Sequence, residues 1–229
     1  LGLQIAHALG EAGATVLVSA RKQDELDAAV AELTAAGIKA TAIAADCGSA
    51  EGAQALAAAA LKQLGEVDIL VNNAGASWGA PAEDHPIEAW DKVMNLNIRG
   101  IFVLTQAIGK ASMIPRKTGS IISVASIAGL GGNPPFMKTI AYNTSKAAVI
   151  NFTKTLAAEW GHYGIRVNAL APGFFPSKMT KGLLVQAGGA DVIAKHAPLQ
   201  RIGDDEDLKG AALLFASDAG KHITGQTLA

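Results

Sequence analysis

The chain has 229 residues, of which 50% are hydrophobic and 17% are charged, and its formal net charge is -1. This length and composition predict one α/β domain with a sizeable core, and the near-neutral charge excludes a basic surface for nucleic acid or a membrane. The single cysteine, Cys47, excludes an internal disulfide and favours a reducing compartment. We find no signal peptide and no long apolar span, so we expect a cytoplasmic protein.

Short β-branched runs alternate with longer alanine- and leucine-rich amphipathic segments along the chain. This alternation predicts repeated βαβ units around a parallel sheet. The expected strands span residues 15–19, 39–44, 69–71, 119–124 and 166–171, and the expected helices span residues 1–12, 24–36, 50–64, 87–112 and 141–161. Because no linker or internal repeat divides the chain, we expect residues 1–229 to form a single Rossmann-like domain: a doubly wound parallel sheet with helices on both faces.

The chain begins inside the first expected helix, before any complete strand. If the domain binds a dinucleotide, its first strand and most of the glycine-rich turn that approaches the pyrophosphate are missing, and Gly2 is the last glycine of that turn. Ligands of such sheets bind at the carboxyl ends of the strands. We therefore look for site residues in the turns that follow the strands.

The first complete strand is followed by Arg21 and Lys22, at the place where dinucleotide folds bind the adenosine ribose. An acid here would accept from both ribose hydroxyls, but no carboxylate occurs before Asp24, which we expect to cap the next helix. Arg21 matches a 2'-phosphate in fork geometry, with Lys22 as a second contact. The pair favours NADP(H) over NAD(H); the alternative is an Arg21 that only faces solvent.

Two later turns carry further candidates. Asp46 and Cys47 follow the second strand, and Asn72-Asn73-Ala74-Gly75 follows the third. Consecutive asparagines can bond backbone groups and hold an irregular turn, while Ala74 and Gly75 leave room for a flat ligand. We read Cys47 as a small buried apolar residue and not as a reactive thiol.

Tyr142 and Lys146 are four residues apart in an expected helix, so their side chains share one face. A phenol titrates near about 10, and a neighbouring cation favours the phenolate and lowers that pKa. The pair can therefore do acid and base chemistry, although a solvated helix face explains most isolated pairs of this kind.

Five motifs in order give the chain a resemblance to the short-chain dehydrogenase/reductase family over nearly its whole length. They are Asn72-Asn73-Ala74-Gly75, Asn97 in its Asn-Leu-Asn context, Ser126 after the fourth strand, Tyr142 with Lys146, and Arg166-Val167-Asn168 followed by Pro172-Gly173. By this resemblance the fold continues into a last strand beyond Ala229. We accordingly expect a domain that is truncated at both ends.

The resemblance implies catalytic roles for four residues. Tyr142 is expected to act as the general acid toward a carbonyl oxygen, or as the base in the reverse direction, and Ser126 to hold that oxygen. Lys146 is expected to lower the pKa of Tyr142 and to bond the nicotinamide ribose. Asn97 resembles the relay residue that holds a water against Lys146; its structural alternative is a helix kink.

The same resemblance places the cofactor. Asp46 and Cys47 are expected to flank the adenine, Asn73, Ala74 and Gly75 to line the cleft, and Pro172 and Gly173 to shape the wall near the nicotinamide. Ser177 takes the position of a threonine that touches the carboxamide. With no His/Cys ligand spacing, no catalytic metal is expected.

The substrate is less closely defined by the sequence. Residues 177–199 are expected to form a lid that excludes water, and residues 131–138, longer than usual for the family, to border the substrate. An apolar wall favours a ketone or 3-oxoacyl substrate reduced with NADPH; its candidates are Trp78, Phe136, Met137, Phe174, Phe175 and Met179. A sugar or polyol of the gluconate type is the alternative.

Two further classes of function stay open. A nucleotide-sensing regulator would keep the fold and lose the chemistry, but such proteins tend to lose the tyrosine or the lysine. An assembly role would use helices 97–113 and 142–161, which in this family commonly build homodimers and homotetramers. We therefore expect an NAD(P)(H)-dependent oxidoreductase that acts on a small molecule as a homo-oligomer, without nucleic-acid or membrane partners.

Overall fold

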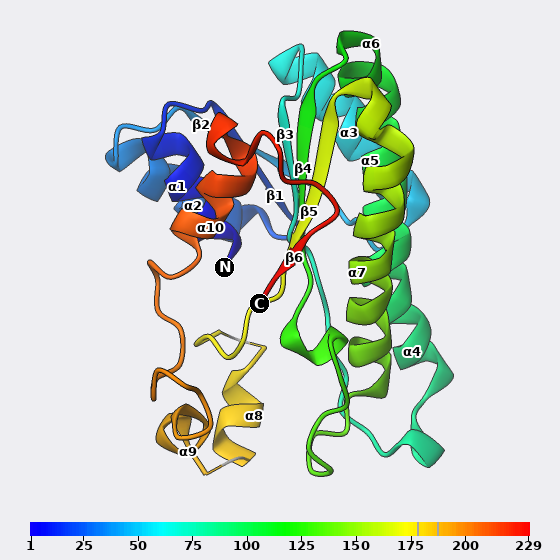
Figure 1. Cartoon of the computed structure of the whole chain (residues 1–229), viewed down its shortest axis with the longest axis vertical. Coiled ribbons are helices and arrows are strands. Elements are labelled where there is room, and N and C mark those ends of the chain that lie inside the picture. Colours follow the sequence, from blue (N-terminus) through cyan, green and yellow to red (C-terminus); the bar gives the residue numbers. More distant parts are fainter. Residues whose placement is uncertain (178, 187) are drawn as a thin grey trace.

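The strands form two parallel sheets in the computed structural model, which describes residues 1–177, 179–186 and 188–229 (Figure 1). In the smaller sheet β1 (Val16–Ala20) pairs with β2 (Ala40–Ala44). The larger sheet has the order β3 (Ile69–Asn72), β4 (Gly119–Val124), β5 (Ile165–Leu170) and β6 (Thr227–Leu228). The first five strands lie within one residue of their predicted positions.

The observed strands differ from the single expected sheet at two places. Within the described residues no strand pairs with both β1 and β3, so the strands form two sheets. At the edge beside β5 the structure contains a short strand where none was expected, because Thr227 and Leu228 pair with Ala169 and Leu170 of β5. Asn168 supports this strand by accepting a hydrogen bond from the backbone nitrogen of Gln226 at 3.1 Å.

Helices cover both faces of the sheets, as predicted (Figure 1). On one face lie α1 (Gly2–Glu11), α2 (Gln23–Ala35) and α10 (Lys209–Ala216), and on the other lie α3 (Ala50–Leu64), α5 (Ile101–Ile108) and α7 (Ile140–Trp160). The first core layer packs α1 and α10 on β4 and β5 through Ile5, Leu9, Ile122, Leu170 and Phe215. The second packs α3, α5 and α7 on the same strands through Ala57, Ile108, Ile121, Leu156 and Val167.

The long helix predicted at residues 87–112 is interrupted twice. It runs as α4 (Ile87–Met94), the π-helical turn η2 (Asn95–Gly100), α5, a second π-helical turn η3 (Gly109–Met113) and α6 (Ile114–Arg116). Both interruptions contain a glycine at a close contact: a Cβ on Gly100 would lie 2.0 Å from the carbonyl oxygen of Cys47, and one on Gly109 would lie 2.2 Å from the ring of Trp160. Such turns are often found at functional sites.

The remaining elements are short. The 3-10 turns are η1 (Ala82–Asp84), η4 (Ile127–Gly129), η5 (Gly161–Tyr163) and η6 (Asp218–Gly220), and α8 (Lys181–Gln186) and α9 (Ala190–Ala194) lie together below the sheet in Figure 1. The prediction that Asp24 caps α2 is wrong. Lys22 occupies the N-cap position, and its side chain makes no capping hydrogen bond. Asp24 lies in the first turn, where its charge suits the helix dipole.

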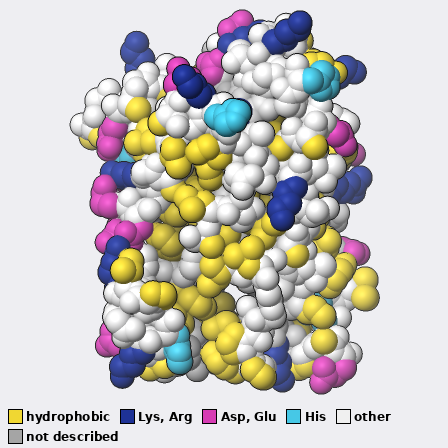
Figure 2. All heavy atoms as spheres, viewed as in Figure 1, with side chains coloured by type: hydrophobic (Ala, Val, Ile, Leu, Met, Phe, Trp, Pro, Cys, Tyr) yellow, Lys and Arg dark blue, Asp and Glu magenta, His cyan; other side chains and the backbone are white. Residues whose placement is uncertain are grey.

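On the face of the molecule seen in Figure 1, hydrophobic side chains gather along the middle and most charged side chains lie toward the margins (Figure 2). The hydrophobic side chains continue to the lower end of the molecule, where α8 and α9 lie in the matching view of Figure 1. None of the helices built from the described residues is long and apolar enough to cross a membrane.

Candidate active site and dinucleotide cleft

The structure brings Ser126, Tyr142 and Lys146 together where β4 ends against α7. Ser126 follows β4 and caps η4, with its hydroxyl oxygen accepting from the backbone nitrogen of Ala128 at 3.1 Å. Tyr142 and Lys146 lie in the first turns of α7, and the lysine Nζ is 5.6 Å from the centre of the tyrosine ring. The Ser126 hydroxyl interacts with the Tyr142 phenol and lowers its pKa. The phenol and this hydroxyl are therefore neighbours.

Burial controls the ionisation of both α7 groups. It raises the pKa of the Tyr142 phenol above its usual value, while the bond with Ser126 lowers that pKa in part. Burial also lowers the pKa of Lys146 to about 8. Nζ of Lys146 donates to the carbonyl oxygen of Val124 at 2.6 Å in this structure. The net pKa of Tyr142 is raised by burial, and the lowering effect of Lys146 on that pKa stays a prediction.

Asn97 is fully buried in the π-helical turn η2, and both polar atoms of its side-chain amide are hydrogen-bonded. Its Oδ1 accepts from the backbone nitrogen of Ala76 at 2.7 Å, and its Nδ2 donates to the carbonyl oxygen of Ala76 and to Ser145 Oγ, both at 2.9 Å. Ser145 in turn donates to the carbonyl oxygen of Tyr142 at 2.7 Å. Asn97 thus ties the turn after β3 to the catalytic helix, and its role as a water relay stays a prediction.

Ser145 is a site residue that the sequence analysis missed. Its position directly before Lys146 was visible in the sequence, but a serine inside a helix ordinarily bonds its own backbone. Only the fold shows that its hydroxyl also receives the Asn97 amide.

A cavity of about 260 Å³ lies at the carboxyl ends of β1, β2 and β3. Three predicted cofactor residues line it: Arg21, Asp46 and Gly75. Its far wall comes from the helix that leads to Asn97 and is formed by residues that the sequence analysis missed, namely Lys92, Asn95 and Leu96. Asp46 shapes the turn after β2 by accepting from the backbone nitrogen of Gly48 at 2.9 Å. The cavity offers two cations and one carboxylate to a ligand.

Lys22 and Cys47, both predicted to contact the cofactor, lie differently from Arg21. The Lys22 ammonium is 3.2 Å from Glu25 Oε1, one turn along α2, and Lys22 is not part of the cavity lining. Cys47 is half-buried with its carbonyl oxygen against Gly100, and burial together with the Asp46 charge raises the pKa of its thiol. Neither side chain contributes to the cavity wall.

The turn after β3 connects this cavity with the catalytic residues. A Cβ on Gly75 would lie 3.5 Å from both Asn97 Oδ1 and Lys146 Nζ, so this glycine of the cavity wall lies next to both side chains. Asn73 and Ala74 are exposed, and a Cβ on Gly2 would lie 2.6 Å from Asn73 Nδ2, which places the start of α1 against this turn. The cavity extends from Arg21 to Gly75, and Gly75 lies next to Lys146, an arrangement that fits an extended dinucleotide.

The wall after β5 is anchored near Ser126. The carbonyl oxygen of Pro172 accepts from the backbone nitrogen of Ile127 at 3.2 Å, and Gly173 lies beside the Ile127 side chain. Ser177 instead bonds within its own turn, with its Oγ 2.9 Å from Thr180 Oγ1. Its contact with the carboxamide and the lid at 177–199 stay predictions, and Lys178 and Ala187 of that lid lie outside the described residues.

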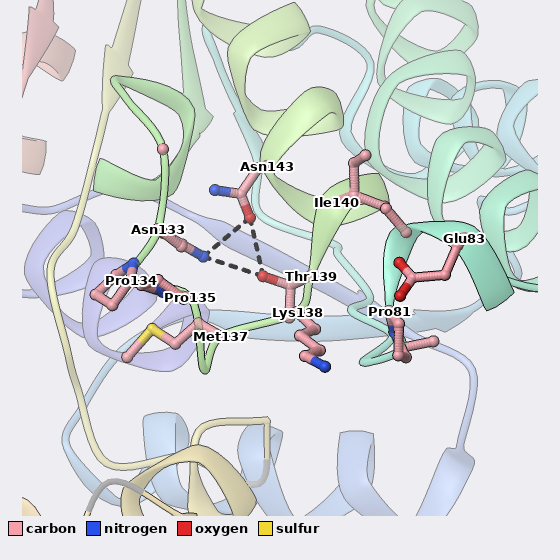
Figure 3. A pocket seen from close by; sticks show the side chains of 13 residues that line it. Pro81, Glu83, Asn133, Pro134, Pro135, Met137, Lys138, Thr139, Ile140 and Asn143 are labelled. Atoms are coloured by element: carbon pink, nitrogen blue, oxygen red, sulfur yellow. Dashed lines mark hydrogen bonds between the residues drawn. The ribbon is translucent and has the colours of Figure 1, made fainter.

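A larger cavity of about 440 Å³ lies between the segment that enters α4 and the segment that enters α7 (Figure 3). Its walls include Pro81, Pro134, Pro135, Met137 and Ile140, with Glu83 and Lys138 as its charged residues. Most of these side chains come from the 131–138 stretch that was expected to border the substrate, or directly follow it. In the described part of the chain no cluster of His, Cys, Asp or Glu side chains could hold a metal ion.

Comparisons with known proteins agree with this geometry. The family model described as enoyl-(acyl carrier protein) reductase matches residues 1–229. The chain is 35% identical to gluconate 5-dehydrogenase of Gluconobacter oxydans over all of its own length and 88% of that protein, and 38% identical to 3-oxoacyl-[acyl-carrier-protein] reductase of Synechocystis over 99% of this chain and 89% of that one. The crystal structure of a gluconate 5-dehydrogenase from Burkholderia cenocepacia with NADP and tartrate superposes with a TM-score of 0.92 at 32% identity, covering 99% of this chain and 88% of that one. The chain therefore belongs to the short-chain dehydrogenase/reductase family of NAD(P)-dependent oxidoreductases.

Proposed function

We propose that this protein interconverts a ketone and a secondary alcohol with NADP(H), with Tyr142 as the proton donor and acceptor. The observation that carries the proposal is the cluster at the end of β4, where the Ser126 hydroxyl interacts with the Tyr142 phenol and the Lys146 Nζ lies 5.6 Å from the centre of the tyrosine ring. When bound, the reduced nicotinamide supplies the hydride that goes to the carbonyl carbon.

The chain's own residues donate the proton and stabilise the charge that develops on the carbonyl oxygen. Ser126 donates a hydrogen bond to the carbonyl oxygen, on which negative charge grows in the transition state. Tyr142 gives its proton to that oxygen, which completes the alcohol, and takes a proton back in the reverse reaction. The Lys146 ammonium, which at present bonds the Val124 carbonyl, stabilises the phenolate that is left and bonds the nicotinamide ribose.

The cofactor end of the cleft supports NADP(H) as the preferred dinucleotide, with NAD(H) as the alternative. Arg21 lines the cavity at the end of β1, where a ribose 2'-phosphate would lie, and no carboxylate is present at that position to bond the two ribose hydroxyls. A guanidinium can meet the phosphate with two parallel hydrogen bonds.

Two substrate classes remain, and we favour a ketone or a 3-oxoacyl compound. Proline, methionine and isoleucine account for five of the thirteen residues that line the larger cavity (Figure 3), and this apolar part of the wall suits an apolar substrate. The relative from Synechocystis is named for a 3-oxoacyl substrate. A sugar acid is the alternative, because the relative from Gluconobacter is named for gluconate and the same cavity carries Lys138.

Several features of the whole protein belong to the same proposal. We infer a cytoplasmic homodimer or homotetramer that assembles through α5 and α7, and residues 177–199 as a lid over the nicotinamide. The exposed Phe102 of α5, 47% accessible and in edge contact with Phe152 of α7, supports that interface. A nucleotide-sensing regulator is disfavoured because Ser126, Tyr142 and Lys146 are all present and gathered.

Replacing Tyr142 with phenylalanine tests the proposed chemistry. The variant keeps the ring and its packing, so we expect unchanged NADPH binding and a turnover lower by about a hundredfold or more. Turnover is followed as the loss of nicotinamide absorbance over a panel of ketones, 3-oxoacyl thioesters and keto sugars. Retained turnover would remove Tyr142 from the mechanism, and tight NADPH binding with no turnover of any compound by the unmodified protein would favour the regulator.

A further inference from the structure

Asn143, the residue after Tyr142, is the centre of a hydrogen-bond network that no catalytic role has so far explained. Its Oδ1 accepts from Thr139 Oγ1 at 2.9 Å and from Asn133 Nδ2 at 3.0 Å, and Asn133 also donates to Thr139 at 3.1 Å. Figure 3 shows these three side chains pointing toward one another beside the larger cavity. On the other side, Asn143 Nδ2 donates to the carbonyl oxygen of Ala128 at 2.9 Å.

The two halves of the Asn143 amide reach different parts of the site. The acceptor half holds the loop of residues 131–139, which supplies much of the wall of the 440 Å³ cavity. The donor half holds η4, the turn that directly follows Ser126, and the backbone nitrogen of the same Ala128 donates to Ser126 Oγ at 3.1 Å. One amide thus connects the substrate border with the residue that carries the catalytic hydroxyl.

The packing of η4 explains why this bond can set the position of Ser126. A Cβ on Gly129 would lie 2.6 Å from the carbonyl carbon of Lys146, so η4 rests on the α7 backbone with no side chain between them. Backbone packing without interlocking side chains lets η4 shift along α7. The directional hydrogen bond from Asn143 to the Ala128 carbonyl fixes the position of η4 relative to α7. A displacement of about 1 Å in a catalytic site can cost about a hundredfold in rate.

We propose that Asn143 is a positioning residue, which through its donor half holds the Ser126 hydroxyl against Tyr142 and through its acceptor half shapes the substrate border. The proposal rests on the proposed function and adds a residue to it. It separates two effects that a general loss of stability would mix: the donor half acts on kcat, and the acceptor half acts on KM.

The test compares variants that remove each half. Asn143→Asp keeps an acceptor for Thr139 and Asn133 but cannot donate to Ala128, so we expect kcat to fall about tenfold or more with little change in KM. The double variant Asn133→Ala with Thr139→Val removes the acceptor's partners, and here KM should rise several-fold while kcat is retained. NADPH affinity, measured by binding, should stay within about twofold in all of them, because none of these residues lines the cofactor cavity.

A double-mutant cycle with Ser126→Ala shows whether the effect passes through Ser126. If it does, Asn143→Asp should lower kcat no further in the Ser126→Ala background. The pH profile of kcat gives a second measurement. The interaction with Ser126 lowers the Tyr142 pKa, so loss of this interaction should raise that pKa and move the basic limb of the profile to higher pH.

Three results would overturn the proposal: additive losses in the cycle, an unchanged pH profile, or equal kcat losses from the two kinds of variant. They differ from a failure of the proposed function, which would appear as retained turnover in Tyr142→Phe. If Asn143→Asp does not fold, Asn143→Ala takes its place in the cycle: it removes both halves of the amide without adding a charge, and its kcat in the Ser126→Ala background tests the donor half.

Discussion

At the scale of single residues, the burial of the Lys146 ammonium lowers the stability of the fold at a position that the proposed chemistry uses. Its side chain is 3% exposed and its ammonium has a carbonyl oxygen as hydrogen-bond partner. Taking a charge out of water favours the neutral amine, and the pKa of Lys146 falls to about 8 as a result. A lysine that titrates near 8 can respond to the state of the phenol beside it, whereas an exposed lysine stays charged.

The lowered pKa predicts a rise in stability between pH 8 and 10. The unfolded chain binds a proton at Lys146 up to a pKa near its ordinary value of 10.5, whereas the folded chain releases it near 8. Stability increases with pH wherever the unfolded state holds more protons, by up to about 3 kcal/mol across the whole window. The raised pKa of Tyr142 acts in the opposite direction above about pH 10, because the folded state then holds the extra proton.

Urea unfolding of the wild type and of Lys146→Met from pH 7 to 10 measures this rise. The methionine variant should show a nearly flat profile. Its absolute stability is not diagnostic, because the Val124 carbonyl loses its donor. A parallel rise in both proteins would show that another group titrates in the window.

Cofactor selectivity divides between two cations of the smaller cavity. Arg21 is the proposed contact of the 2'-phosphate, and Lys92 lines the same cavity from the opposite wall beside Leu96, where the base would extend. Arg21→Asp should therefore move the preference from NADPH toward NADH, whereas Lys92→Met should weaken the binding of both dinucleotides by a similar factor, about tenfold or more for one charge-assisted hydrogen bond.

Binding titrations with NADPH and NADH give the two ratios. Lys22→Met is the matched control, since its ammonium pairs with Glu25 outside the cavity and the variant should bind like the wild type. An unchanged ratio for Arg21→Asp would mean that Arg21 faces solvent. A changed ratio for Lys92→Met would place that ammonium on the phosphate instead of the base.

The interrupted helix from α4 to α6 matters at the scale of elements because it positions both ends of the site. Its first π-helical turn carries Asn97 to Ala76 and Ser145, and Gly100 in the same turn lies against the Cys47 carbonyl oxygen. The turn after β2, which supplies Asp46 to the cofactor cavity, is therefore packed directly on the element that holds Asn97.

Gly100→Ala should disturb that packing. Its methyl group would lie 2.0 Å from the backbone oxygen of Cys47, so we expect a loss of about 1–3 kcal/mol in the free energy of unfolding together with weaker dinucleotide binding. Gly210→Ala in α10 is the matched control: nothing lies within 4 Å of its new methyl group, and it should stabilise by up to about 1 kcal/mol. Urea midpoints compare the two, and a neutral Gly100→Ala would show that the turn after β2 can move away without cost.

The strands and the gathering of Ser126, Tyr142 and Lys146 could be predicted because they depend on local pattern and on motif. The π-helical turns could not, since the hydrophobic period of residues 87–112 is continuous and the interruption is set by contacts with Cys47 and Trp160, far away in sequence. The burial that raises the Tyr142 pKa could not be predicted from the spacing of the charges, because it depends on tertiary packing, and the lowering of that pKa by Lys146 stays a prediction. Lys92 was missed for a similar reason: a lysine on a helix gives no sign of which cavity its helix borders.

At the scale of the whole molecule, the strands of the two sheets differ in how deeply they are buried. No strand residue of β1 or β2 is fully buried, whereas nearly every residue of β4 and β5 is. Regions with few buried groups open at lower free energy than the global unfolding. The β1–β2 unit should therefore open before the larger sheet does.

The dinucleotide would join the two sheets, because the smaller cavity takes Arg21 and Asp46 from the β1–β2 side and Gly75 and Leu96 from the other. Hydrogen exchange should then be faster in β1 and β2 than in β4 and β5, and saturating NADPH should slow it selectively in β1 and β2. At a hundred times its dissociation constant, a ligand that binds only the closed form adds about 2.7 kcal/mol to the opening free energy, or about a hundredfold in exchange rate. Equal exchange in both sheets would mean that they unfold as one unit, and protection confined to β3 and β4 would show that the ligand does not reach across the division.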